Sequence, residues 1–291
     1  MSASQSRGKP APADPCAMLI GALELRQRNF TRQLARVRRR PSEPGVHDLR
    51  VATRRLIAVI NLMAEIVEIP LLLKKRKALR SLLKGLNALR DAHIRRIALR
   101  KLCAEFPSAG LVQRGILVQE RDLLRAVARN LRLFDVRGLH GAITEAEELF
   151  LTVGLNSALA SAHRSVLIGA LASAFARVVG RLQTLQGTDP STVHRLRVAF
   201  KQYRYALEIL APLLPWMNAA TRSRLDTYQT AMGKIQDNVV VLRGMSAYES
   251  RRPVTGRMAL IGVRQYLLRR TEELMKEFLA NAGGVYRFWK D

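Results

Sequence analysis

The sequence has 291 residues, and its 49 Lys and Arg against 23 Asp and Glu give a net charge of +26. Hydrophobic residues make up 48% of the chain, which excludes wholesale disorder because enough apolar surface is present to form cores. The basic excess predicts a polyanionic partner, whereas an aromatic share of only 5% argues against single-stranded nucleic acid held by base stacking.

The N-terminal part of the chain predicts a tail followed by two helices. Residues 1–15 are rich in Ser, Ala and Pro, so we expect a disordered tail. Apolar residues at helical spacing predict a helix from about Cys16 to Arg40, which carries Arg28 and Arg32 along one side. Residues 41–45, with two prolines and a glycine, should break it. The next helix is predicted over 46–69, with Pro70 marking its end.

The remainder of the first half is also predicted to be helical. Residues 71–102 are apolar at helical spacing and studded with cations, including Arg80 and Lys84. Residues 106–110 read as a loop and 111–130 as a helix. A short acidic helix over 143–153 is predicted as a connector, and we interpret its Glu145, Glu147 and Glu148 as a solvated turn.

The second half follows the same plan. Helices are predicted over 155–186, 193–210, 217–248 and 256–281, with breaks at 187–190 and 251–253 and a Gly283-Gly284 tail. The chain shows no sustained alternation of apolar and polar residues and no Asn-Gly hairpin signal. The predicted fold class is therefore all-α.

Two short segments of the sequence occur twice at nearly the same separation. Residues 46–56 and 193–203 share the pattern Val-His-x-Leu-Arg-Val-Ala, and their histidines, His47 and His194, lie 147 residues apart. Residues 86–94 align with 232–240, where Asp91 and Asp237 lie 146 residues apart. A fixed offset in two separate places predicts an internal duplication.

The repeated His-containing helices are predicted to be basic on one side and apolar on the other. At about 100° per residue, His47, Arg50 and Arg54 lie opposite an apolar stripe, and His194, Arg197, Lys201 and Arg204 do the same in the second copy. The two apolar stripes are Leu49, Ala52, Leu56, Val59, Ile60 and Met63, and Leu196, Ala199, Tyr203, Ala206, Leu207 and Leu210. Most charged faces are merely solvated, but these carry a single sign of charge and recur. Since both histidines follow a break, they could also be simple first-turn residues.

The duplicated motifs resemble the CHAD family, the conserved histidine α-helical domain, over nearly the whole chain from about Cys16. The resemblance implies two four-helix bundles related by pseudo-twofold symmetry, here residues 16–150 and 151–291. It also implies a basic groove or pore that binds inorganic polyphosphate and association with polyphosphate granules. The implied motif positions are His47, Arg50, Arg54, Arg55, His194, Arg197 and Lys201. Gln202 departs from the pattern where the first copy has Arg55.

The expected polyphosphate site also includes basic residues outside the motif positions. These are Arg204 on the second motif helix, Arg28 and Arg32 on the opening helix, and Arg80 and Lys84 on the helix over 71–102. Asp91 and Asp237 are expected to orient neighbouring arginines rather than to bind ligand. His93, His140 and His163 are interpreted as incidental.

Other classes of function have less support. No phosphate-binding loop, His-Glu-x-x-His or Gly-x-Ser-x-Gly motif is present, so we expect no enzyme, no cofactor and no metal site. Nonspecific nucleic-acid binding is the alternative, and we expect it to be weak and salt-sensitive. Cys16 and Cys103 form no CxxC pair, and we find no secretion signal and no membrane span, which predicts a cytoplasmic protein.

Overall fold

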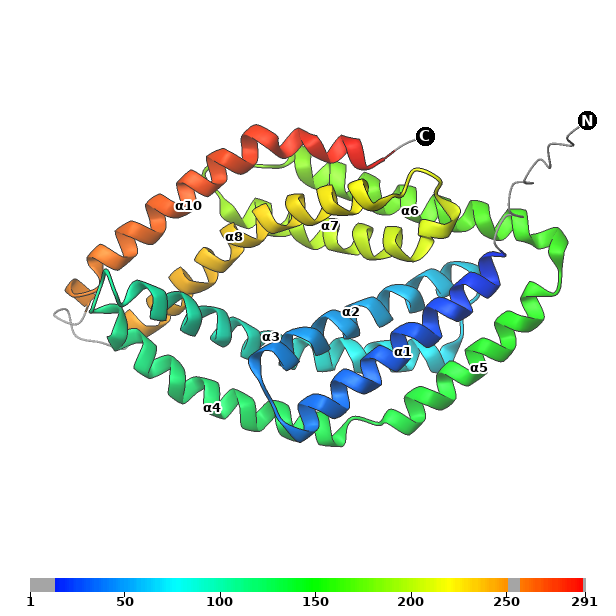
Figure 1. Cartoon of the computed structure of the whole chain (residues 1–291), viewed down its shortest axis with the longest axis horizontal. Helices are drawn as coiled ribbons and strands as arrows, with labels where there is room; N and C mark the ends of the chain where they lie inside the picture. The colour runs from blue at the N-terminus through cyan, green and yellow to red at the C-terminus, as the bar shows by residue number, and fades with distance from the viewer. Residues whose placement is uncertain (1–13, 251–256, 290–291) are drawn as a thin grey trace, which may run out of the picture.

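The computed structural model describes residues 14–250 and 257–289, apart from the side chain of Ser157. These residues are helical and contain no strand, which confirms the all-α fold (Figure 1). The first half contains α1 (Pro15–Arg39), α2 (Glu43–Ile66), α3 (Pro70–Leu102), α4 (Ala109–Leu133) and α5 (Val136–Gly154). The second contains η1 (Ser157–Leu159), α6 (Ala160–Gln183), α7 (Pro190–Leu210), η2 (Ala211–Leu213), α8 (Ala219–Glu249), α10 (Ile261–Asn281) and η3 (Ala282–Phe288).

The two motif helices, α2 and α7, start in the same way. The Ser42 hydroxyl accepts the N–H of Gly45 at 3.2 Å, and the Asp189 carboxylate accepts the N–H of Ser191 at 2.8 Å. A proline in the first turn of each supplies a backbone angle already suited to a helix. Both helices start three residues before the predicted positions, so each motif histidine is the fifth helical residue. This geometry contradicts the alternative that the histidines are first-turn residues.

The apolar stripe predicted on α2 is buried as expected. Leu49, Leu56, Ile60 and Met63 have no exposed surface, and each fully buried aliphatic side chain contributes roughly 1.5–3 kcal/mol. On α7, Leu196, Tyr203, Leu207 and Leu210 are buried, while Ala199 and Ala206 are partly buried against the same core. The orientation of both motif helices was therefore predictable from the spacing of their apolar residues.

The two halves are held together at both ends. One large core runs through α1, α2, α6 and α7 and continues into both halves. A second core, including Leu99, Ile116, Met245 and Leu267, joins α3 and α4 to α8 and α10 at the far end. Figure 1 shows α2 and α7 side by side in the middle of the molecule and the second junction at its left edge. The polar sides of α2, α3, α7 and α8 face one another between these two junctions.

Several predicted boundaries are wrong. Pro70 begins α3 instead of ending α2, because the preceding helix already stops at Ile66. The connector predicted over 143–153 is the 19-residue helix α5, which buries Leu139, Ile143 and Phe150 and packs against α1 and α3. Gly138 and Gly141 lower the helix propensity of this segment, and burial of its apolar side compensates for that loss. Its glutamates thus lie on a helix, and Glu145 and Glu148 are exposed.

The chain end also differs from the prediction. The Gly283-Gly284 tail is part of η3, which buries Val285 and Phe288 in the large core. The Tyr203 hydroxyl donates to the Phe288 carbonyl, and the Tyr228 hydroxyl donates to the Ala282 carbonyl at 2.8 Å. The predicted break over 251–253 and the predicted start of the last helix at 256 lie outside the described residues. The predicted tail also lies outside them, apart from residue 14, which precedes α1, and Pro15, which starts it.

α6 is the one described helix that is long and apolar enough to cross a membrane by length and composition. The sequence analysis had predicted no segment of this kind. Its Leu167, Leu171 and Val178 are fully buried in the large core, whereas only 28% of its most apolar stretch is buried. A single helix of this kind is weak evidence for a membrane span.

Candidate functional site

A cavity of about 720 Å³ lies between the two halves of the protein. The motif helices α2 and α7 supply one side, α3 and α8 supply another, and Gln119 and Leu123 of α4 contribute to its rim. The cavity exists because the halves are joined by apolar cores on either side of it, while the facing surfaces between those cores carry charges.

The walls of this central cavity are strongly basic. Its cationic side chains are Arg50, Arg54, Arg90, Arg95, Arg197, Lys201 and Arg243. Only two carboxylates, Asp91 and Asp237, lie among them, so the lining has an excess of five positive charges when every Lys and Arg is protonated and both histidines are neutral. An anion entering the cavity would relieve the mutual repulsion of these cations.

Burial and mutual repulsion disfavour the charged forms of the buried cations in the cavity. Burial, together with repulsion from Arg197, Arg54 and Arg50, lowers the pKa of Lys201 to about 6. Burial likewise lowers the pKa of Arg50 to about 9, with Arg54 as the next cause. Lys201 is therefore largely uncharged near neutral pH until an anion arrives.

Two buried guanidinium nitrogens in the cavity have no hydrogen-bond partner among the described residues. These are one terminal nitrogen of Arg50 and Nε of Arg197. Each is a donor removed from water, and a buried donor left without an acceptor costs about 1–3 kcal/mol. A phosphate oxygen would supply the missing acceptor, and Arg donors suit two-pronged contact with such oxygens.

The motif histidines lie at the cavity in different surroundings. Burial lowers the pKa of His47, and the positive charge of Arg90 lowers it further. His194 Nδ1 lies 2.6 Å from Gln236 Oε1. Because an amide oxygen only accepts, this geometry places the proton on Nδ1 and leaves Nε2 as the acceptor in the neutral ring.

Nearby arginines act electrostatically on both cavity aspartates. Burial raises the pKa of Asp91 while nearby Arg50, Arg95 and Arg90 oppose the shift. Burial also raises the pKa of Asp237, opposed first by Arg197. Elsewhere, too, the described residues contain no group of three or more His, Cys, Asp or Glu placed to hold a metal ion.

The structure brings half of the sequence-predicted site residues into this cavity. His47, Arg50, Arg54, His194, Arg197 and Lys201 all line it. The other six lie outside the central cavity.

Arg55 and Arg204 turn away from the cavity and share the carboxylate of Glu208, at 3.3 Å and 2.9 Å. Together with Arg32 they line a separate cavity of about 630 Å³ between α1, α2, α7 and α8. Arg28 pairs with Glu24 at 3.2 Å on the exposed face of α1. Arg80 and Lys84 are exposed on α3 and line neither cavity.

Sequence reasoning missed several residues that line the central cavity. Arg90, Arg95, Gln236 and Arg243 come from α3 and α8, away from the His-containing motif. A signal was present, since Arg90 and Gln236 immediately precede the repeated aspartates of the second motif. His93, which we had interpreted as incidental, is buried and lies 3.4 Å from Glu120.

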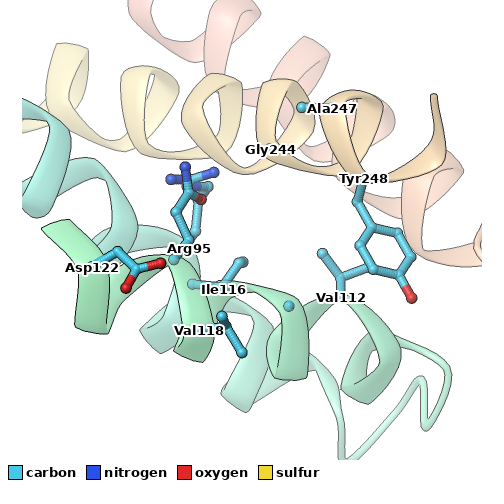
Figure 2. Close-up of a pocket in the computed structure, with 10 residues that line it drawn as sticks. Arg95, Val112, Ile116, Val118, Asp122, Gly244, Ala247 and Tyr248 are labelled. Atoms are coloured by element: carbon cyan, nitrogen blue, oxygen red, sulfur yellow. The ribbon is translucent and has the colours of Figure 1, made fainter. Parts of the chain in front are cut away.

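A smaller pocket of about 490 Å³ adjoins the central cavity between α4 and α8. The two share Arg95, Gln119, Gly244 and Ala247. Figure 2 shows Arg95 at one end and Tyr248 at the other, with Val112, Ile116 and Val118 along the α4 side. The Arg95 side chain lies so close to Gly244 that a methyl group there would collide with its Cδ atom. Gly244 thus makes room for a cavity cation.

Comparison with known proteins agrees with this architecture. The chain superimposes on the crystal structure of the CHAD domain from the plant Ricinus communis with a TM-score of 0.71 and 21% identity, covering 98% of this chain and 96% of that one. PptA from Streptomyces chartreusis gives a TM-score of 0.67 and 16% identity, over 94% of this chain and 100% of that one. No curated protein matches the chain at a significant level. The CHAD domain model matches residues 21–243, about three quarters of the sequence, and the protein therefore belongs to the CHAD domain family.

Proposed function

We propose that the protein binds inorganic polyphosphate in the central cavity. The observation that carries the proposal is the lining itself, in which cations from both halves surround one space with only Asp91 and Asp237 as counter-charges. Polyphosphate carries about one negative charge per phosphate and no bases, so it needs closely spaced cations and no aromatic platform.

The arrangement of the motif helices suits a linear phosphate chain. Arg50 and Arg54 on α2, and Arg197 and Lys201 on α7, are each four residues apart. Four residues of helix advance about 6 Å, a step that follows successive or alternate phosphates. The unpartnered nitrogens of Arg50 and Arg197 add donors without requiring that an existing bond be broken.

Family membership supports the same proposal, since the motif resemblance implies polyphosphate as the ligand. We propose binding without turnover, in the cytoplasm and at polyphosphate granules. Release of orthophosphate on incubation with Mg²⁺ and polyphosphate would contradict the first point. A tagged protein that stays diffuse in cells containing granules would contradict the last.

The test is titration calorimetry with long-chain polyphosphate. The variant Arg50→Ala/Arg54→Ala/Arg197→Ala/Lys201→Ala should bind at least about a hundredfold more weakly, since each lost charge-assisted contact is worth about 1.5–3 kcal/mol. The control, Arg121→Ala/Arg129→Ala/Arg269→Ala/Lys276→Ala, removes four exposed cations outside the cavity. It should change affinity by less than about threefold. Equal losses in both variants would indicate that net charge alone drives binding.

Nonspecific nucleic-acid binding is the alternative, because a net charge of +26 would support it. We expect such binding to be weak and to fall steeply with salt. Polyphosphate should displace DNA at equal phosphate concentration, with little effect in the reverse direction. Displacement that is equally effective in both directions would favour the alternative.

Ligand binding should also stabilise the fold. Packing like charges around the cavity costs free energy in the unliganded protein, and a bound polyanion removes that cost. The melting temperature should therefore rise with added long-chain polyphosphate. A flat or falling melting temperature would count against the cavity as the binding site.

A further inference from the structure

A chain of alternating Arg and Glu side chains, which ends at His93, runs from the central cavity into the first half of the protein. Arg90 lies 3.1 Å from one carboxylate oxygen of Glu43, and Arg96 lies 3.3 Å from the other. The Nε of Arg96 is 2.8 Å from Glu120, whose other oxygen is 3.4 Å from His93. These five residues, which we name the ionic chain, connect the first turn of α2 with α3 and α4.

Only one end of the ionic chain reaches the cavity. Arg90 lines it, whereas Glu43, Arg96, Glu120 and His93 do not. Glu43 therefore contacts Arg90 from outside the cavity. The side chains of Arg90 and Glu43 are 22% and 27% exposed, so water screens this pair less than a surface pair.

The second half has no equivalent of this chain at the matching positions. With the motif offsets of 147 and 146 residues, Pro190 stands where the first half has Glu43, and Gln236 stands where it has Arg90. Gln236 instead bonds to His194. The first half thus places Arg90, paired with Glu43, beside its motif histidine, and the second half places the neutral amide of Gln236 there.

We propose that Glu43 is a positioning residue that holds Arg90 against the cavity wall for phosphate contact, an inference that rests on the proposed function. A free arginine side chain loses rotamer freedom when a ligand immobilises it. The pair with Glu43, which Arg96 and Glu120 hold in turn, imposes that order before the ligand arrives, so less is lost on binding. Glu43 also lies in the first turn of α2, where a carboxylate is favoured by the helix dipole.

The proposal predicts that removing the Glu43 carboxylate weakens polyphosphate binding, whereas simple electrostatics predicts that it tightens binding. Removing a carboxylate close to a polyanion site should tighten binding if charge alone mattered. We expect Glu43→Gln to weaken polyphosphate binding about fivefold, because Arg90 loses its support. The matched control is Asp48→Asn, also on α2, whose carboxylate pairs at 3.1 Å with Arg36 outside the cavity. It should leave affinity unchanged or slightly tighter. Binding by Glu43→Gln that equals or exceeds that of the control overturns the inference.

A second measurement separates positioning from a general loss of structure. The slope of log affinity against log salt counts phosphate contacts, and Arg90→Gln should reduce it by about one. Glu43→Gln should reduce it in the same direction, whereas Asp48→Asn should not. The double variant Glu43→Gln/Arg90→Gln should bind no more weakly than Arg90→Gln alone, because Glu43 acts through Arg90. Additive losses overturn the inference, and wild-type binding by Arg90→Gln overturns it even if Glu43→Gln does not fold.

The same experiments distinguish a failure of the proposed function from a failure of the positioning role of Glu43. Wild-type protein that fails to bind polyphosphate overturns the proposed function. Wild-type binding with a Glu43→Gln variant that behaves like Asp48→Asn overturns the positioning role of Glu43 alone.

Discussion

The two halves of the protein line the central cavity with different charged residues. The first half contributes Arg50, Arg54, Arg90 and Arg95, all of them arginines. The second contributes Arg197, Arg243 and Lys201, and burial lowers the pKa of that lysine to about 6. One wall of the cavity thus carries lasting positive charge, and the other includes a lysine whose charge depends on protonation.

The largest expected effect comes from removing the motif cations of one half at a time. At pH 7, Arg50→Ala/Arg54→Ala should weaken polyphosphate binding about a hundredfold, since two full charges are lost. Arg197→Ala/Lys201→Ala should weaken binding only about tenfold, because protonating Lys201 on binding costs about 1.4 kcal/mol per pKa unit. At pH 5.5 the two losses should converge. Calorimetry at both pH values tests this, and equal losses at pH 7 would contradict the comparison.

The next effect concerns the proton that Lys201 gains on binding. In the free protein its pKa is about 6, and a bound polyanion raises that value. Affinity should be level below pH 6, fall up to about tenfold per pH unit above it, and level off again above the pKa of the complex. Calorimetry in buffers of different ionisation enthalpy should show proton uptake near pH 7.

Lys201→Arg provides the control for this proton uptake, since an arginine stays charged across this range. In this variant the uptake should shrink and the pH dependence should flatten, leaving only what the cavity histidines and aspartates contribute. Those groups are His47, His194, Asp91 and Asp237. Undiminished proton uptake in Lys201→Arg would show that these four groups, and not Lys201, take up the proton.

A smaller effect should come from two glycines of α8 that face cavity arginines of different halves. In Gly244→Ala the new methyl group collides with Arg95, so polyphosphate affinity should fall about threefold as that side chain moves. In Gly233→Ala the methyl group would lie 3.5 Å from Arg197, an ordinary contact, and affinity should not change. Both changes favour the helix by roughly 0.5–1 kcal/mol, so helix stability cannot explain a difference. Equal affinities of the two variants would remove Arg95 from the site.

The sequence was sufficient to predict the fold class, the apolar stripes and the central pair of helices. Single-sided stripes such as Leu49, Leu56 and Met63 leave little choice about which side of α2 is buried. The same reasoning placed Arg50, Arg54, Arg197 and Lys201 together, because each lies opposite its stripe. The internal duplication stays a prediction from the two matching offsets.

The remaining cavity residues required tertiary structure. Arg95 and Arg243 lie on long helices, α3 and α8, whose many charges give no clear sign of which ones face inward. Conversely, Arg55 and Arg204 satisfied the pattern but are held by Glu208, an acid from the last turn of α7. Local sequence cannot show which acid a cation meets when the partner is more than a hundred residues away, as it is for Arg55.

The smallest effect tests stability rather than binding, and it applies to the second half. There the C-terminal segment η3 supports the core, because Tyr228 donates a hydrogen bond to the Ala282 carbonyl and packs against Phe288. Tyr228→Phe should lower the free energy of unfolding by about 1–3 kcal/mol, since it leaves that carbonyl without its donor. Urea denaturation measures this change.

Tyr286→Phe is the matched control for Tyr228→Phe, because the Tyr286 side chain is 52% exposed and lies in the same segment. It should change stability by less than about 0.5 kcal/mol. Neither variant should alter polyphosphate affinity, since neither tyrosine lines the central cavity. A loss of affinity in Tyr228→Phe would mean that the aromatic core of the second half positions the α7 cations, Arg197 and Lys201. The two halves would then differ in what supports their cations as well as in charge, with an ionic chain in the first and an aromatic core in the second.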